Sequence, residues 1–157
     1  MACKFTVMDD IDRKIITLLA QDARRSIADI GAEVGLSTSA ANERVRRLAG
    51  SGSIRRFTVD VDPETFGAPI LAFVFVALAA DADEAAFRGF VAGQALVLEC
   101  HHVTGGWSYL LKIRVGSLPE LEGFLSLLKD GRFIARSETI IALSSVLPGT
   151  FTPRDAD

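Results

Sequence analysis

The spacing of apolar residues changes near residue 50, and this change most limits what the chain can fold into. Before that point, Ile11, Ile15 and Leu18 recur at intervals that place them on one face of a helix. Beyond it, uninterrupted apolar runs such as residues 70–78 have the length and composition of buried strands. The sequence therefore predicts a helical N-terminal domain joined to a second domain that contains a sheet.

Two shorter helices are expected after the first, at residues 27–34 and 38–49. Ser26 and Ser37 precede them as caps, because a serine hydroxyl accepts hydrogen bonds from the first free N–H groups of a helix. Gly35 supplies the tight turn between the two helices. Three helices with a glycine in this turn are typical of a helix-turn-helix DNA-binding fold.

Three acidic residues stand at the start of the first helix: Asp9, Asp10 and Asp12. Paired carboxylates can act in acid–base catalysis, but carboxylates are also favoured at a helix N-terminus, where the helix dipole attracts negative charge. We interpret these residues as N-terminal capping groups.

The segment after the third helix, residues 50–62, is interpreted as a wing and a linker strand. It begins with the turn sequence Gly-Ser-Gly-Ser, and residues 54–61 then alternate as a strand does, with Phe57 and Val59 on one side. Asp62-Pro63 ends the expected strand.

The rest of the chain predicts four strands and two helices in the order βαββαβ. The expected strands are residues 70–78, 96–103, 109–115 and 136–143, and the expected helices are residues 83–92 and 118–128, the latter with Leu118, Leu121, Leu125 and Leu128 inward. This order is that of a ferredoxin-like domain, with two helices on one face of an antiparallel sheet. The predicted fold class is α+β, with a winged helix-turn-helix at residues 9–54, a linker strand at 55–67 and a ferredoxin-like βαββαβ domain at 68–149.

The sheet face opposite the predicted helices is also rich in apolar residues. Exposed apolar surface of this extent is rare in a monomer. With no further domain to cover it, a second copy of the chain is the expected partner.

The net charge of −3 and the pI of about 5.4 do not by themselves indicate a nucleic-acid partner. Local clustering does, because five arginines lie at positions 44, 46, 47, 55 and 56, and a guanidinium group makes paired hydrogen bonds to phosphate. The alternative is a solvated helix face with salt bridges. Since the cluster follows a helix-turn-helix, DNA contact is predicted for Ser37, Thr38, Ser39, Asn42, Arg44, Arg46, Arg47 and Arg55. Thr38, Ser39, Asn42 and Arg46 are placed to reach base edges.

A series of short motifs resembles the Lrp/AsnC family of transcription regulators. They are DDIDRKI at residues 9–15, VGLS at 34–37, RVRRL at 44–48, VTG at 103–105 and YLLK at 109–112. Their order and spacing together carry the resemblance, which runs from Asp9 to about Leu147.

The resemblance implies a regulator that binds double-stranded DNA and responds to an amino acid or a related metabolite. It further implies dimers formed through the C-terminal sheet, and octamers built as a tetramer of dimers. The effector would bind at the turn after the second strand of that domain, here Thr104, Gly105, Gly106 and Ser108, where the N–H groups of a glycine turn can receive a carboxylate.

Two residues depart from the family pattern. Ala49 stands where the family has an acidic residue after Arg47-Leu48, and Ser108 stands where the family has an aspartate in the turn that would bind the effector. Because serine offers no charge to an ammonium group, four possibilities stay open at this point. An ordinary amino acid binds weakly, another ligand binds, or none does. In the fourth, Ser108 is only a turn residue and the ammonium group pairs with Glu99 or Glu138 of a neighbouring subunit.

No metal, cofactor or catalytic site is predicted. Cys100 and His102 share one side of an expected strand and His101 takes the other, which leaves too few ligands for zinc. The chain has no nucleophile elbow and no phosphate loop. Cys3 and Cys100 are therefore interpreted as reduced thiols of a cytoplasmic protein.

Two other functions fit part of the sequence: a small-molecule-binding subunit or enzyme built on the ferredoxin-like half, and a purely structural oligomer. Both leave residues 37–56 without a role. A membrane protein is not expected, because the most apolar run, residues 68–80, has 13 residues and is too short to span a bilayer. Met8 is an alternative start, which would make residues 1–7 an extension.

Overall fold

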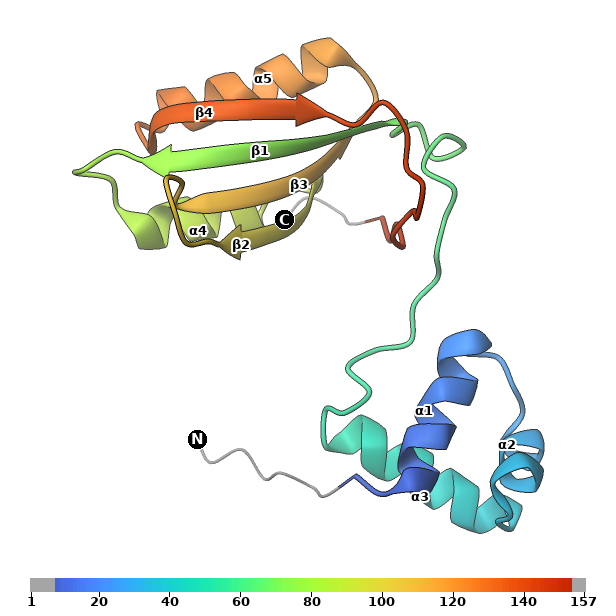
Figure 1. Ribbon diagram of the computed structural model, residues 1–157. Helices are drawn as coiled ribbons and strands as arrows, with labels where there is room; N and C mark the ends of the chain where they lie inside the picture. Colours follow the sequence, from blue (N-terminus) through green and yellow to red (C-terminus); the bar gives the residue numbers. More distant parts are fainter. Residues whose placement is uncertain (1–7, 154–157) are drawn as a thin grey trace. The chain divides into compact units, whose positions relative to one another are not determined.

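The computed structural model describes residues 8–153, so Cys3 and the stretch before Met8 lie outside the described residues. The chain divides into two compact units, with the boundary between Thr58 and Val59. The first unit is helical and the second contains a sheet with two helices (Figure 1).

The first unit packs three helices around one small core: α1 (Asp10–Gln21), α2 (Ile27–Val34) and α3 (Thr38–Gly50). Both predicted serine caps are confirmed, because the Ser26 hydroxyl accepts the Asp29 N–H and the Ser37 hydroxyl accepts the Ala40 N–H. The buried core is apolar and drawn from all three helices: Ile15, Leu18, Leu19, Ile30, Ala41 and Leu48. The helix-turn-helix predicted from the apolar spacing is thus present.

The turn between α2 and α3 depends on two glycines. Gly35 ends α2 with φ of 71°, in the left-handed region that favours glycine. Gly31 lies where the chain doubles back on the helix, because the Leu36 N–H donates to the Gly31 carbonyl at 2.8 Å. A Cβ added at residue 31 would lie 2.8 Å from the Leu36 carbonyl oxygen, so the close approach requires glycine.

Gly31→Ala is expected to destabilise the helix-turn-helix unit by about 1–3 kcal/mol, since the added methyl would push against backbone. Urea unfolding followed by circular dichroism measures this change. Gly123→Ala is the control, because Gly123 also lies inside a helix but has no atom within 4 Å of an added Cβ. That exchange should stabilise by about 0.5–1 kcal/mol. Equal effects of the two substitutions would contradict the steric interpretation.

The strand predicted at residues 54–61 is absent from the structure. The Ile54 N–H donates to the Leu48 carbonyl and closes the end of α3. Further along, the Val61 N–H donates to the Phe151 carbonyl, so the chain at Val61 runs beside the C-terminal segment. Alternating side chains do not suffice for a strand, since the hydrogen-bond ladder also needs a neighbouring strand.

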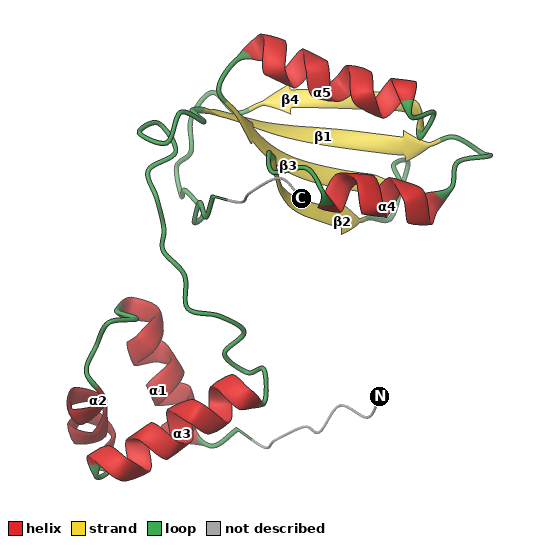
Figure 2. Ribbon diagram, turned by 180° about the vertical axis from the view of Figure 1, so that it is seen from behind, coloured by secondary structure: helices red, strands yellow, loops and turns green. Residues whose placement is uncertain are grey.

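The second unit has the predicted βαββαβ order. Its elements are β1 (Ile70–Leu78), α4 (Glu84–Ala92), β2 (Val97–His102), β3 (Tyr109–Val115), α5 (Leu118–Asp130) and β4 (Ile134–Ile141). The sheet order is β2-β3-β1-β4, with every neighbouring pair antiparallel. Figure 2 shows both helices on the same face of this sheet, as expected for a ferredoxin-like domain.

The core between sheet and helices corrects two details of the prediction. Leu118 is 56% exposed, because it is the first residue of α5, and Phe124 is buried on that helix instead. The last strand begins at Ile134, two residues earlier than predicted, directly after a turn in which Arg132 has φ of 54°. The apolar pair Ile140 and Ile141 ends the strand rather than occupying its middle.

Candidate DNA-binding and effector sites

Helix α3 carries the predicted base-reading residues on one exposed side. Successive residues turn by about 100° around a helix, so Ser39, Asn42 and Arg46 share a face. All three are exposed, whereas Ala41 and Leu48 of the same helix are buried. The structure therefore brings these three predicted residues together on a surface that a ligand can reach, with Thr38 exposed beside them in the first turn.

Arg44 and Arg47 lie on another side of α3 and are already paired. Arg44 donates to the Asp9 carboxylate at 2.6 Å and to Asp12 at 2.9 Å, while Arg47 donates to both Asp12 oxygens at 2.8 Å. The Arg44 hydrogen bond holds the pKa of Asp9 below its usual range. The sequence pattern did not reveal these acidic partners, because Asp9 and Asp12 stand more than 30 residues away from the arginines along the chain.

Three arginines of the predicted cluster remain exposed, and none forms an ion pair within the described range: Arg46, Arg55 and Arg56. Arg55 and Arg56 follow the end of α3 on the segment that leaves the helix-turn-helix. The cluster is thus divided between two arginines that bind acids within the protein and three that are available to phosphate.

The predicted effector residues lie together in the turn between β2 and β3. Gly105 has φ of 103°, a conformation that needs glycine. Ser108 is tied to β1, because its N–H donates to the Val76 carbonyl at 2.8 Å and its hydroxyl oxygen accepts the Leu78 N–H at 3.1 Å. Thr104 and Gly106 are exposed beside it. The motif of the turn does not predict this hydrogen bond between the Leu78 N–H and the Ser108 hydroxyl.

Arg136 of β4 holds the outer part of the same turn. Its Nη2 donates to the Gly106 carbonyl at 2.7 Å, and its guanidinium carbon lies 4.1 Å from the centre of the Trp107 ring. Trp107 in turn contacts Phe75 of β1, with ring centres 5.8 Å apart. The turn is therefore held both to β1 and to β4, although the sequence pattern gave Arg136 no role.

The sheet face opposite α4 and α5 carries apolar side chains in its middle and charged ones around them. The C-terminal segment lies over one end of this face, where Arg114 contacts the Phe151 ring, and no described helix or strand covers the rest. The strand register places Phe73 and Phe75 of β1 on this face, next to Leu110 of β3 and Ile140 of β4. Ile140 is 47% exposed. Apolar surface of this kind favours association with another protein surface.

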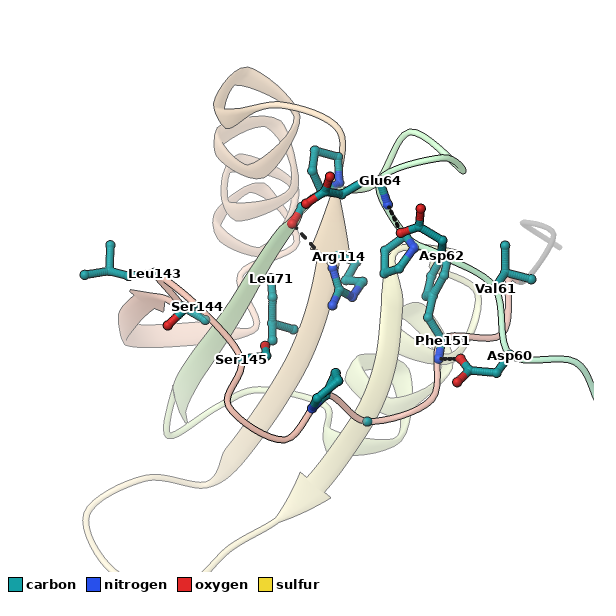
Figure 3. Close-up of a pocket in the computed structure, with 15 residues that line it drawn as sticks. Asp60, Val61, Asp62, Glu64, Leu71, Arg114, Leu143, Ser144, Ser145 and Phe151 are labelled. Atoms are coloured by element: carbon teal, nitrogen blue, oxygen red, sulfur yellow. Dashed lines mark hydrogen bonds between the residues drawn. The ribbon is translucent and has the colours of Figure 1, made fainter. Parts of the chain in front are cut away.

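A cavity of about 470 Å³ lies between the linker, the start of β1 and the C-terminal segment (Figure 3). Its walls include Asp60, Asp62 and Arg114. These polar groups hold the linker: Asp60 accepts the Phe151 N–H at 2.6 Å, Asp62 accepts the Glu64 N–H at 3.1 Å, and Arg114 donates to the Ala68 carbonyl at 3.2 Å. The cavity walls thus hold residues 60–68 against the rest of the second unit.

Phe151 anchors this arrangement and was missed by the sequence-based domain end at residue 149. Its side chain is 5% exposed and packs edge-on against Phe66, with ring centres 5.7 Å apart. A single aromatic residue in an otherwise polar tail was the available signal.

The strand β2 places its cysteine and histidines as predicted. Cys100 and His102 are paired with Leu111 and Tyr109 on the helix side, and His101 faces the other side. Burial raises the pKa of the Cys100 thiol. Within residues 8–153, no three His, Cys, Asp or Glu side chains lie close enough together to hold a metal ion.

Over the same range, no helix combines the length and the apolarity needed to cross a bilayer.

Both units match domains of one family. Residues 8–49 match the AsnC-type helix-turn-helix domain, and residues 71–150 match the Lrp/AsnC ligand binding domain. The chain is 34% identical over 139 residues to the HTH-type transcriptional regulator FL11 of Pyrococcus horikoshii, covering 88% of this chain and 91% of the relative. It is 37% identical over 125 residues to the leucine-responsive regulatory protein of Escherichia coli, covering 78% and 74% of the two chains.

The fold agrees with the solved structures of such proteins. Bacillus subtilis LrpC superposes with a TM-score of 0.80 at 30% identity, covering 88% of this chain and 96% of that one. Sequence, fold and domain order point to the same conclusion. The chain belongs to the Lrp/AsnC family of transcriptional regulators.

Proposed function

We propose that α3 enters the major groove of double-stranded DNA and that this contact gives the regulator its choice of sequence. Thr38, Ser39 and Asn42 face the base edges, with Ser37 at the helix start close to the phosphates. Arg46, for which the sequence predicted base contact with phosphate contact as the alternative, is proposed to contact phosphate together with Arg55. The observation that carries the proposal is the common exposed face of Ser39, Asn42 and Arg46 on a helix whose other sides are packed or paired. Recognition helices place their N-terminal residues in this way.

The salt dependence of DNA affinity tests this assignment. Arg46→Ala combined with Arg55→Ala is expected to weaken binding and to reduce the slope of log K against log salt by roughly 0.9 for each phosphate that the protein no longer neutralises. Fluorescence anisotropy with the DNA upstream of the protein's own gene, at several salt concentrations, gives both quantities.

Lys129→Ala is the matched control, because it removes an equally exposed positive charge at the end of α5. Its slope should equal that of the wild type. An unchanged slope in the double variant would reject this surface as the phosphate-binding face, and a reduced slope in Lys129→Ala would place the contact in the second unit.

The effector site is proposed at Thr104, Gly105, Gly106 and Ser108, at a contact between dimers. The glycine turn offers backbone N–H groups to a carboxylate. The E. coli relative is named for its response to leucine, and this supports an amino acid or a related metabolite as the ligand.

Assembly is proposed to begin with a two-fold dimer that buries the open sheet face, because a self-complementary patch is satisfied by the same patch of a second copy. Four such dimers would form an octamer. A regulator that binds chromosomal DNA acts in the cytoplasm, which is the location that we propose.

A further inference from the structure

Asp12 of α1 is the only charged side chain that is buried within residues 8–153, with 1% of its surface exposed. Its partners are not on its own helix. Arg44 and Arg47, both from α3, donate three hydrogen bonds to its two carboxylate oxygens at 2.8–2.9 Å. A buried carboxylate on one helix therefore holds two side chains of the helix that carries the base-reading residues.

The cluster around Asp12 is balanced in charge. Asp9 accepts a further hydrogen bond from Arg44 at 2.6 Å, so two carboxylates face two guanidinium groups. Asp9 and Asp12 are themselves linked, because the Asp12 N–H donates to the Asp9 carboxylate at 2.7 Å. Asp12 is the buried member of the set, and removing its arginine partners would be strongly unfavourable because a buried carboxylate would be left without a paired charge.

The two anchors lie three residues apart, so they occupy neighbouring turns of α3 on one side. At about 100° per residue, Ser39, Asn42 and Arg46 fall on the opposite side. Two anchor points along a helix resist both rotation about its axis and sliding along it. The apolar contacts of Ala41 and Leu48 lack this directionality, because packing of apolar side chains is not directional.

We propose that Asp12 is the positioning residue of the recognition helix: through Arg44 and Arg47 it sets the rotation of α3 that presents Ser39, Asn42 and Arg46 to DNA. The inference rests on the proposed function, in which α3 contacts DNA. It also changes the role of two predicted contact residues, because Arg44 and Arg47 then act mainly within the protein rather than on phosphate.

One substitution distinguishes a positioning role of Asp12 from an effect of its charge alone, because the two predict different changes in DNA binding. An acid near DNA repels phosphate, so replacing it by a neutral residue should tighten binding if its charge alone matters. Asp12→Asn keeps the size and shape of the side chain and removes its charge. If Asp12 positions α3, the same substitution lowers the preference for the correct sequence.

The experiment measures affinity by fluorescence anisotropy for two duplexes, the DNA upstream of the protein's own gene and a scrambled duplex of the same composition. Asp12→Asn is expected to reduce the ratio of the two affinities about tenfold, with the affinity for scrambled DNA unchanged or higher. Asp10→Asn is the matched control, because Asp10 is an exposed acid in the same first turn. It should leave the ratio unchanged.

Loss of folded protein, which circular dichroism detects, lowers both affinities in proportion and leaves their ratio unchanged. In an Asp12→Asn protein that is folded, an unchanged ratio overturns the proposal, as does equal tightening by Asp12→Asn and Asp10→Asn. If Asp12→Asn does not fold, Arg47→Ala decides. Its side chain is 45% exposed, so the substitution leaves no new cavity in the core. A reduced ratio with an unchanged salt slope supports positioning, and a slope reduced by roughly 0.9 identifies Arg47 as a phosphate contact and overturns it.

Failure of the proposed function would look different from all of these outcomes. In that case the wild type would show neither a preference between the duplexes nor a salt slope that falls in the Arg46→Ala and Arg55→Ala double variant. A wild type that passes both tests, with Asp12→Asn behaving like Asp10→Asn, removes the inference and leaves the function in place.

Discussion

Phe73→Glu is expected to convert the protein into a monomer and to weaken DNA binding about 10²- to 10⁴-fold, the usual gain from linking two binding sites. Phe73 lies in the middle of β1 on the open sheet face, between Lys112 of β3 and Ile140 of β4. In a dimer formed through this face, the new carboxylate would be taken out of water at an effective penalty of several kcal/mol. In the monomer it stays in solvent, so the fold itself should survive.

Light scattering at micromolar concentration measures the change in mass, and anisotropy with a DNA duplex measures the change in affinity. Leu127→Glu is the matched control, because Leu127 is 50% exposed on α5, on the side of the sheet away from the open face. It introduces the same charge in place of an apolar side chain and should leave the mass unchanged. A Phe73→Glu protein that keeps the wild-type mass would show that the oligomer is built through another surface.

The elements that sequence predicted well are those defined by local patterns. Ser26 and Ser37 mark the starts of their helices because a cap acts on N–H groups two or three residues away. The strand at residues 70–78 has the same limits in the structure, since nine apolar residues in a row leave little freedom over what is buried. The alternation of Cys100, His101 and His102 likewise follows from the period of a strand.

The features that sequence did not predict depend on residues that are distant along the chain. Asp12 meets Arg44 and Arg47 only after α1 and α3 pack, and no spacing rule links positions 32 and 35 residues apart. Phe151 is buried because the tail returns to Asp60, 91 residues away. The strand expected at residues 54–61 failed for the complementary reason: its local pattern was suitable, but a strand also requires a neighbour.

Ser108→Asp is expected to tighten the binding of an α-amino acid about ten- to a hundredfold. A hydrogen bond to a charged group contributes roughly 1.5–3 kcal/mol, which corresponds to this range of affinity. The structure shows how the exchange is tolerated, because the Ser108 hydroxyl oxygen accepts the Leu78 N–H at 3.1 Å. One carboxylate oxygen of the aspartate can take over that hydrogen bond, and the second oxygen is then available to the ammonium group of a ligand.

Titration calorimetry with the twenty amino acids, on the wild type and on Ser108→Asp, measures the change. Ser126→Asp is the control, because Ser126 is an exposed serine on α5, away from the turn. It adds the same charge to the domain, so a gain seen only in Ser108→Asp locates the effect in the turn. If the wild type already binds tightly and Ser108→Asp does not change its affinity, residue 108 serves only to fasten the turn to β1. If Ser108→Asp instead abolishes binding, the ligand is recognised by a neutral hydroxyl, and the serine selects a ligand that lacks an ammonium group.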